Sequence, residues 1–240
     1  MKIGIISDIH GNYDALTVVI EELKNAGVDL IVNAGDNVGY SPFPDECVRI
    51  LKRENIAGVM GNYDEAVGFK LSSCGCGNAC EALEGIQQAS LRWTQDCVSD
   101  DTREYLCGLP RNLQVESDFG NIMIMHGHLY KKENIFEYDD GKFAEISRST
   151  RAPLIVMGHT HQPSCRTVDG TVFVNPGSVG KPVDNDPRAS YAIAEMGEQI
   201  RVDLFRTEYP VEQNIKALEE AGLPQIIGKW LREGRSGFID

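Results

Sequence analysis

Met157-Gly158-His159-Thr160-His161 is the stretch of this 240-residue chain on which the fold prediction rests. It continues the apolar run Leu154–Met157, which has the length and composition of a short buried strand. Two histidines one residue apart at a strand end project to the same side if the chain stays extended. We therefore expect a pair of imidazoles at the end of a buried strand.

All five histidines of the chain lie in three short motifs, and each motif follows an apolar, strand-like run. The motifs are Asp8-x-His10, His126-Gly127-His128 and His159-Thr160-His161. Histidines scattered over a surface would not show this distribution. Three strand ends are therefore expected to converge on one metal centre.

Strand-like and helix-like segments alternate at the start of the chain, which predicts an α/β sheet with helices on its faces. The expected elements are strands at Lys2–Ser7, Leu30–Asn33 and Ile56–Met60, and helices at Tyr13–Ala26 and from Pro42 or Pro44 to about Arg53. Further on, strands are expected at Leu113–Glu116, Asn121–Met125, Cys165–Val168, Thr171–Asn175, Tyr191–Glu195 and Gln199–Phe205, and helices at Glu81–Val98, Asp101–Cys107 and Phe143–Ser149.

The domain organisation predicted from this pattern is one large domain with a small addition. Residues 1–208 form the main domain, with an insertion around residues 72–80. Residues 209–240 form a C-terminal helical appendage packed on it, because Val211–Ala221 and Ile226–Arg232 have helical periodicity.

The charge balance limits the class of partner. With 23 basic and 36 acidic residues, the formal net charge is −13, whereas a nucleic-acid binder would show a basic stripe. Long nucleic acid is therefore not expected as a partner. A phosphate substrate stays compatible, since bound divalent cations reverse the sign of the field at one site.

The chain shows no membrane or secretion signal, so a cytoplasmic protein without membrane contact is expected. No apolar run approaches the roughly 18–20 residues of a membrane span, and Met1-Lys2 leads directly into a strand instead of a signal peptide. The odd number of cysteines, seven, fits a reducing compartment. The oligomeric state is left open.

Cys74, Cys76 and Cys80 lie in a glycine-rich loop that allows two interpretations. They could bind a soft metal together with Cys97 or Cys107. They could instead belong to a mobile insertion near the mouth of the site. Their spacing matches no common zinc pattern, which favours the insertion.

The polar residues at the predicted strand ends form a set of carboxylates, imidazoles and one amide. They are Asp8, His10, Asp36, Asn62, His126, His159 and His161. Thiolate is absent from this set, which disfavours a structural zinc site, and mixed nitrogen and oxygen ligands suit manganese, iron, zinc or nickel. Seven ligands are too many for one tetrahedral ion but suit two ions that share a bridging carboxylate. Two ions about 3.5–4 Å apart can clamp a phosphate and neutralise the attacking and leaving oxygens.

The three histidine motifs, together with Gly35-Asp36 and Gly61-Asn62-x-Asp64, resemble the five-motif signature of the calcineurin-like metallophosphoesterases. Asn175-Pro176-Gly177-Ser178 is similar to the small bacterial and archaeal phosphodiesterase branch. The resemblance covers most of residues 1–205. It implies two packed mixed β-sheets flanked by helices, a four-layer αββα sandwich. It also implies hydrolysis by a metal-bound water or hydroxide that attacks phosphorus in line, without a phosphoenzyme.

The same resemblance implies a ligand assignment for two divalent ions, for which we favour manganese. Asp8, His10, Asp36 and His161 would hold one ion. Asp36, Asn62, His126 and His159 would hold the other, with Asp36 bridging.

The main departure from the family pattern is Tyr63, where many members have a histidine near the leaving-group oxygen. Tyrosine has an unperturbed pKa near 10, so it is a weaker proton donor at neutral pH. An alkoxide leaving group benefits from protonation, so the departure favours diesters or nucleotide anhydrides over monoesters. Asn62, Tyr63 and His128 are the candidate catalytic residues, and Lys181 and Arg188 are candidate phosphate ligands.

The predicted function is a dinuclear metal-dependent phosphodiesterase for small phosphodiesters or nucleotides. A dinucleoside polyphosphate hydrolase and a phosphomonoesterase are alternatives of the same class, and a nuclease shares the chemistry. A non-catalytic metal-binding interaction scaffold is the alternative from another class. It is disfavoured because no expected ligand is missing from the sequence.

Overall fold

The first strand, β1 (Lys2–Ile6), lies at the centre of a five-stranded mixed sheet in a computed structural model that describes residues 1–75, 81–127 and 139–237. The strand order is β10-β9-β1-β2-β3. Strand β1 pairs in parallel with β2 (Leu30–Asn33) and antiparallel with β9 (Ala189–Glu195). Strands β3 (Ala57–Gly58) and β10 (Arg201–Thr207) form the two edges.

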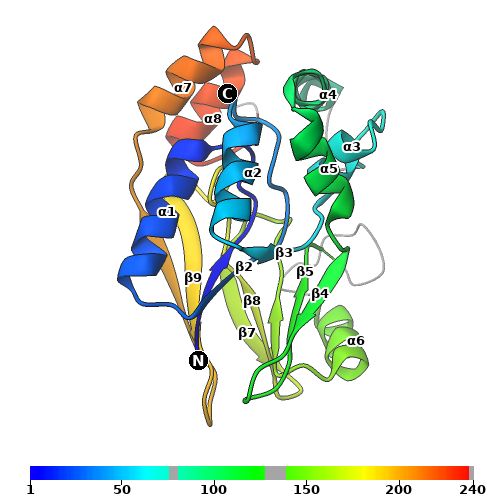
Figure 1. The fold of residues 1–240 in the computed structure, drawn as a ribbon, viewed down its shortest axis with the longest axis vertical. Helices are drawn as coiled ribbons and strands as arrows, with labels where there is room; N and C mark the ends of the chain where they lie inside the picture. Colours follow the sequence, from blue (N-terminus) through cyan, green and yellow to red (C-terminus); the bar gives the residue numbers. More distant parts are fainter. Residues whose placement is uncertain (76–80, 128–138, 238–240) are drawn as a thin grey trace.

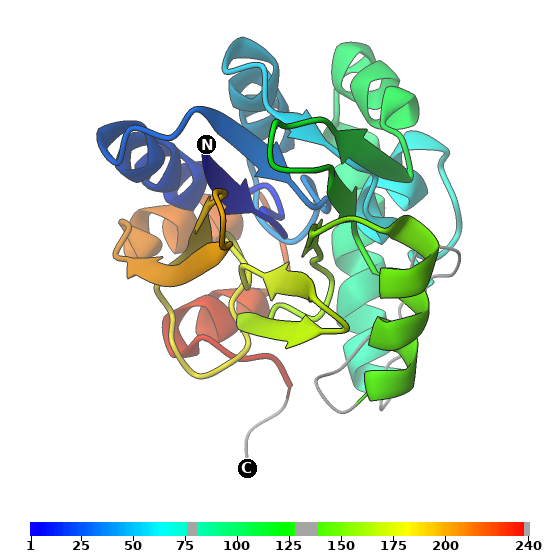
Figure 2. The same cartoon turned by 90° about the horizontal axis from the view of Figure 1, so that it is seen from below.

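A second mixed sheet of five strands packs against the first (Figures 1 and 2). Its order is β4-β5-β6-β8-β7, formed by Asn112–Val115, Ile122–Met125, Leu154–Val156, Thr171–Asn175 and Ser164–Val168 respectively. The central strands β5, β6 and β8 are parallel, and β4 and β7 pair antiparallel at the edges. The strands expected in this region are present and form the antiparallel pairs β4–β5 and β7–β8.

The core between the sheets consists of aliphatic side chains from both inner faces. Ile3, Ile5 and Val32 from the first sheet lie in one buried cluster with Ile124 and Val156 from the second. Alternation along β1 sends Ile6 to the opposite face, where a separate cluster contains Leu16, Val19 and Leu51 of the flanking helices. Burial of these apolar faces holds the layers together.

Helices cover the outer faces of both sheets (Figure 1). Helices α1 (Tyr13–Asn25) and α2 (Pro44–Arg53) pack on the first sheet, and α6 (Asp140–Thr150) packs on the second. Asn12 caps α1 by accepting from the backbone N–H of Ala15 at 3.2 Å. The predicted architecture of two packed mixed sheets flanked by helices is confirmed.

The remaining helices gather beyond the sheets, at the top of Figure 1. They are α3 (Asn62–Gly68), α4 (Glu81–Cys97), α5 (Asp100–Gly108), α7 (Val211–Glu220) and α8 (Gln225–Glu233). Leu218 and Trp230 of the last two helices share one buried cluster with Tyr63 and Leu91. The boundary between residues 1–208 and 209–240 stays a prediction, and the C-terminal helices pack on the helices that precede the second sheet.

One local expectation was wrong, and one helix was not among the expected elements. The strand expected over Ile56–Met60 is reduced to Ala57–Gly58, because only these two residues pair with β2 and the Met60 N–H donates instead to Pro110 O at 2.7 Å. The segment Asn62–Gly68 forms a full helix, with the Asp64 carboxylate accepting from the Gly61 N–H at its start.

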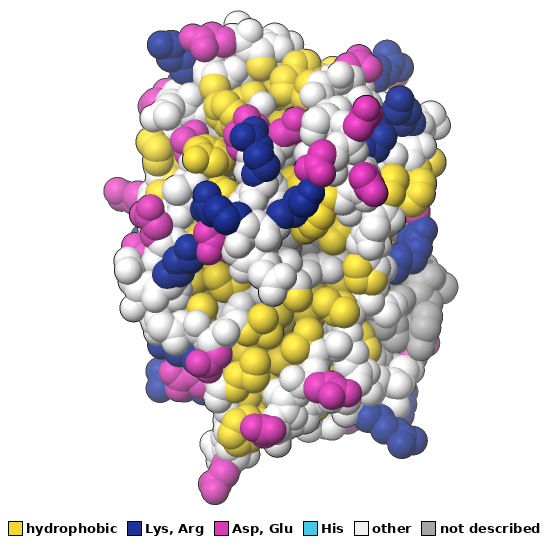
Figure 3. All heavy atoms as spheres, in the orientation of Figure 1, with side chains coloured by type: hydrophobic (Ala, Val, Ile, Leu, Met, Phe, Trp, Pro, Cys, Tyr) yellow, Lys and Arg dark blue, Asp and Glu magenta, His cyan; other side chains and the backbone are white. Residues whose placement is uncertain are grey.

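The surface mixes charges of both signs. Figure 3 shows acidic and basic side chains interspersed over one face, with apolar side chains between them. Within the described residues, no helix combines the length and apolar character that a membrane crossing requires.

Candidate metal centre

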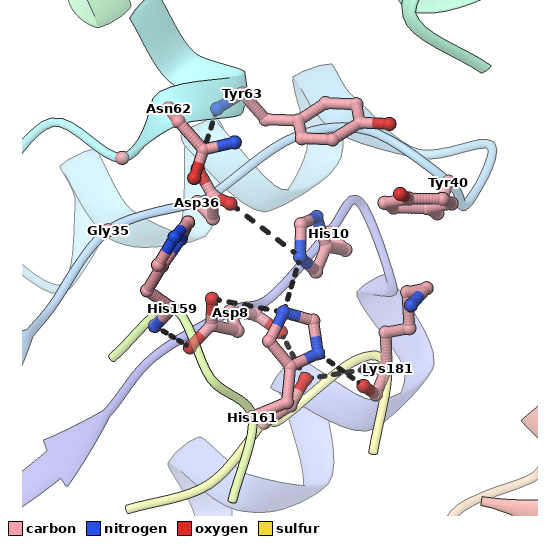
Figure 4. Close-up of polar contacts among 12 residues, drawn as sticks. Asp8, His10, Gly35, Asp36, Tyr40, Asn62, Tyr63, His159, His161 and Lys181 are labelled. Carbon is pink, nitrogen blue, oxygen red and sulfur yellow. Dashed lines mark hydrogen bonds and ion pairs between the residues drawn. The ribbon is translucent and has the colours of Figure 1, made fainter. Parts of the chain in front are cut away.

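The predicted ligands follow neighbouring strand ends of the two sheets. Asp8 and His10 follow β1, Asp36 follows β2, Asn62 follows β3, His126 follows β5, and His159 and His161 follow β6. Carboxyl ends of parallel strands meet at one edge of a sheet, which is where ligands bind in α/β folds. Because the two sheets face each other, the loops from both edges converge (Figure 4).

Asp8, His10 and His161 form the first group, with one ligand atom of each within 4.8 Å of the others, and all three are buried. The Nε2 atoms of His10 and His161 lie 3.2 Å apart, and His161 Nε2 lies 3.3 Å from Asp8 Oδ1. The Nδ1 atoms contact backbone carbonyls, His10 at Val38 O (3.2 Å) and His161 at Lys181 O (2.6 Å).

Asp36, His126 and His159 form the second group, again with ligand atoms within 4.8 Å of one another. His126 Nε2 lies 3.1 Å from His159 Nδ1 and 3.4 Å from Asp36 Oδ2. The Asn62 Oδ1 atom lies 3.0 Å from the same nitrogen, so this amide belongs to the group. His126 Nδ1 contacts Ala34 O at 2.7 Å, which fixes the ring orientation.

Asp36 lies between the two groups. Its Oδ2 atom is 3.4 Å from His126 Nε2 in the second group and 3.8 Å from His10 Nε2 in the first. Its Oδ1 atom accepts from the Tyr63 backbone N–H at 2.8 Å. This position is the one that a bridging carboxylate requires.

The ligand loops are not extended, contrary to the simplest expectation for the two histidines after β6. His159 and His161 have φ values of 72° and 58°, and Asp8, His10 and Asp36 also lie in the left-handed region. Such conformations are uncommon for non-glycine residues and concentrate at functional sites. The turn separates the pair, so that His159 joins the second group and His161 the first.

The first group has the electronic character of a cation site. Both Nδ1 atoms face carbonyl oxygens, and a ring whose Nδ1 donates to a carbonyl leaves its Nε2 available to coordinate a cation. Burial lowers the pKa of His10 to about 3, so this ring stays neutral. Asp8 Oδ1 is buried without a hydrogen-bond partner. Two facing Nε2 atoms beside a buried carboxylate oxygen fit a divalent cation.

In the second group, the neighbouring carboxylate favours the protonated form of His126. Burial opposes protonation of His126, but the Asp36 carboxylate outweighs it and raises the pKa of His126 to about 10. Burial and the neighbouring His126 lower the pKa of His159 to about 4, so its Nδ1 accepts the proton that His126 Nε2 donates. The negative charge of Asp36 is thus compensated by protonated His126, and a bound cation would take over that role.

Asp64 holds the loops that carry the second group. Its carboxylate accepts from the backbone N–H of Asp36 (2.9 Å), Asn37 (2.8 Å) and Gly61 (3.0 Å), and from Asn37 Nδ2 (2.9 Å). Burial and the charge of Asp36 raise the pKa of Asp64 to about 7, against the effect of the N–H donors.

The structure places the remaining candidates differently. The Tyr63 ring is 1% exposed and packs edge-on against His10, and its hydroxyl points away from the metal groups and donates to Gln87 O at 3.4 Å (Figure 4). Its role as a candidate catalytic residue stays a prediction. The Arg188 guanidinium donates to the Asp186 carboxylate, which belongs to neither group.

Lys181 lies beside the first group, with its ammonium 4.6 Å from the centre of the Tyr40 ring, which in turn contacts His10 (Figure 4). His128, Cys76 and Cys80 lie outside the described residues, and Cys74 is buried.

Sequence reasoning missed the residues that position Asp8. The Ser7 hydroxyl donates to Asp8 Oδ2 at 2.7 Å, and the Ser178 hydroxyl donates to Asp8 O at 2.7 Å. Ser178 belongs to the Asn-Pro-Gly-Ser stretch, so a signal for it was present. Nothing in the sequence distinguishes Ser7 from an ordinary strand residue.

Two groups of carboxylates and imidazoles, with Asp36 in contact with both, form a candidate site for two metal ions at the facing edges of the two sheets. The sequence matches the calcineurin-like phosphoesterase superfamily domain over residues 1–199, and the chain belongs to that superfamily. It is therefore a phosphoesterase of the metal-dependent hydrolase class.

Three comparisons show which members of the superfamily this chain is similar to. A metallophosphoesterase from Sphaerobacter thermophilus superposes with a TM-score of 0.76 and is 31% identical, covering 98% of this chain and 99% of that one. An uncharacterized protein of Methanocaldococcus jannaschii is 29% identical over 249 residues, 97% of this chain and 98% of its own. The phosphodiesterase YfcE of Escherichia coli K12 is 24% identical over 198 residues, 81% of this chain and 88% of its own.

Proposed function

We propose that the protein is a dinuclear metal-dependent phosphodiesterase that hydrolyses small or nucleotide phosphodiesters by direct attack of water on phosphorus. The observation that carries the proposal is the position of Asp36 Oδ2 between His126 and His10, which links two complete ligand groups. A diesterase among the relatives, YfcE, supports the same reaction class.

Each group would hold one divalent ion, and manganese is our first choice. When bound, the ions supply positive charge to the phosphate oxygens and lower the pKa of the attacking water. Asp36 would join the two sites, and Asn62 would complete the second site with its amide oxygen. His159 is the more exposed imidazole of the second group, so this side of the site faces incoming substrate.

Tyr63 supports diesters over monoesters. The leaving alkoxide of a phosphomonoester or alkyl ester benefits from a proton donor. The Tyr63 hydroxyl donates to Gln87 O instead and points away from the groups. Diesters with good leaving groups need this proton less.

Lys181 would supply a further positive charge for the substrate. Its ammonium lies near enough to His10 that its charge contributes to the lowered pKa of that ring. A phosphodiester anion held at the metal groups would gain from the same field. The formal net charge of −13 favours a small substrate over long nucleic acid.

The experiment is a substrate panel run on protein that has been freed of metal and reloaded with Mn²⁺, Zn²⁺, Fe²⁺ or Ni²⁺. Bis(p-nitrophenyl) phosphate, cyclic nucleotides and dinucleotides test the diesterase, p-nitrophenyl phosphate tests the monoesterase, and dinucleoside polyphosphates test the anhydride hydrolase. We expect diester turnover to exceed monoester turnover. A protein that binds two ions and turns over none of these substrates would contradict the proposal and favour the scaffold.

The matched control is His126→Ala. It removes one ligand of the second group and leaves the first group complete, so a folded variant without diester turnover assigns the activity to this site. Retained turnover in folded His126→Ala would assign it to a contaminant.

A further inference from the structure

The C-terminal helices α7 and α8 lie beyond residues 1–199, the part of the chain that matches the superfamily domain. Their contacts nevertheless reach the loops of the first ligand group. Both helices share a buried cluster with Val38 and Tyr63. Helices α7 and α8 therefore border the candidate metal centre.

Asn214 of α7 makes the most buried polar contact between the addition and the metal loops. It is 0% exposed, and its Nδ2 donates to Asn12 Oδ1 at 3.0 Å. The same Asn12 oxygen accepts from the Ala15 N–H, which begins helix α1. Asn12, also 0% exposed, is thus held in place by a residue of the C-terminal helix α7.

Asn12 belongs to the loop that carries Asp8 and His10. Its backbone N–H donates to Ile9 O at 3.0 Å, within that loop. Its Nδ2 donates to Gly180 O at 3.0 Å and to the Tyr209 hydroxyl at 3.2 Å. The Gly180 N–H in turn donates to Asp8 O at 3.0 Å. One amide therefore ties the ligand loop to the loop of Gly180 and to two residues of the C-terminal segment.

Helix α8 reaches the same group from another direction. The Trp230 ring lies 5.5 Å from the Lys181 ammonium, and Lys181 O accepts from His161 Nδ1 at 2.6 Å. The Lys181 N–H donates to Ser178 Oγ, whose own hydroxyl donates to Asp8 O.

The second group is held by different partners. Asp64 accepts from the loops of Asp36 and Gly61, and Ala34 O contacts His126 Nδ1. These partners belong to the loops after β2 and β3 and to helix α3. The hydrogen bonds of Asn214 and Tyr209 described above both lead, through Asn12, to the loop of the first group.

We propose that Asn214 is a positioning residue for the first metal site, and that helix α7 completes this site through Asn12. The inference rests on the proposed function, because it assumes one ion in each group. It predicts that loss of the Asn214 contact weakens one of the two sites and spares the other. Partners that orient metal ligands typically contribute about 10–100-fold to affinity, so we expect a change of about tenfold.

The test is Mn²⁺ binding to metal-free protein, measured by titration calorimetry for the wild type, Asn214→Ala and Tyr209→Phe. Tyr209→Phe removes only the hydroxyl that accepts from Asn12 Nδ2, so it provides a second reading if Asn214→Ala does not fold. Thermal unfolding of the metal-free variants measures any general loss of stability.

Trp93→Phe is the control. Its indole Nε1 donates to Ala221 O at 2.9 Å, so it also ties the C-terminal segment to the body, but it does not contact Asn12. We expect Trp93→Phe to lose stability and to bind both ions as the wild type does.

One weakened site in Asn214→Ala or Tyr209→Phe, with two normal sites in Trp93→Phe, supports the proposal. Wild-type affinity at both sites, or equal weakening of both, overturns it. A wild type that binds two ions without hydrolysing diesters contradicts the proposed function alone, because this test measures ion binding and not turnover.

Discussion

The Nε2 atoms of His10 and His161 face each other at 3.2 Å, while the Nδ1 atom of each ring contacts a backbone carbonyl. Both rings come from loops with left-handed backbone and lie in a buried site. A cation bound between the two nitrogens would be coordinated by both rings and by the buried Asp8 carboxylate, so metal is expected to stabilise the first group.

Metal addition should therefore stabilise the chelated protein. An ion at about 100 times its Kd stabilises a native protein by about 2.7 kcal/mol for each site. Thermal unfolding after chelation and after addition of Mn²⁺ or Zn²⁺ measures this. His161→Ala should show a smaller response, whereas an unchanged midpoint in the wild type would contradict two native metal sites.

Asp36→Asn should lose more activity than any variant of a surrounding residue. The amide keeps the size of the side chain but removes the charge that both groups share. We expect a loss of at least about 100-fold in kcat/KM and less bound metal. Exposed Asp118→Asn is the control, and an active Asp36→Asn with two bound ions would rule out the bridging role.

Metal binding at the second group should release a proton. Asp36 raises the pKa of His126 to about 10, so the metal-free protein carries a proton there at neutral pH, and a cation must displace it. The affinity of this site should rise about tenfold per pH unit below pH 10. Calorimetry at pH 8 in buffers with different ionisation enthalpies counts the proton, and a pH-independent affinity would refute the assignment.

The same pKa fixes the sign of the stability change in metal-free protein. The folded pKa of His126 lies above the unfolded value, so its contribution is fully present below about pH 6.5 and is lost as pH rises through 10. His126→Asn should therefore lose less free energy of unfolding between pH 7 and pH 10 than the wild type does. Urea unfolding at these two pH values measures the difference.

Asp64→Asn should destabilise the second group without removing a ligand. The carboxylate accepts from four N–H donors, and an amide would point its own donors at some of them. A buried unsatisfied donor costs about 1–3 kcal/mol. Urea unfolding at pH 8 should show this loss in free energy of unfolding, and wild-type stability in Asp64→Asn would argue against the network.

Tyr63→Phe separates two roles for the residue that replaces the usual family histidine. Its hydroxyl donates to Gln87 O, away from the groups, so the structure predicts a change in diester kcat of less than about threefold and a stability loss of about 1 kcal/mol. A catalytic proton donor would instead lose about 100-fold or more. Steady-state kinetics across pH 6–9 decides between them.

The sequence was sufficient for the architecture because its periodic signals are local. Alternating segments predicted an α/β sheet, and the family resemblance implied a second sheet packed on it. The strands expected at Cys165–Val168 and Thr171–Asn175 pair as β7 and β8. The short β3 was overestimated because Ile56–Met60 has strand composition, while pairing with β2 limits it to two residues. Pairing across the sheet is a tertiary property that composition does not contain.

The candidate site was predicted in its residue types but not in its geometry. Strand-end histidines indicated a metal centre, yet the left-handed turns at His159 and His161 are set by surrounding loops and carry no glycine signal. The contact of Asn214 with Asn12 spans 202 positions along the chain. No local pattern encodes such a partner.

The most direct measurement is anomalous diffraction from crystals of the manganese-loaded protein. Our account predicts two peaks, one among Asp8, His10 and His161 and one among Asp36, His126 and His159, with Asp36 between them. A single peak, or two peaks away from these residues, would contradict it.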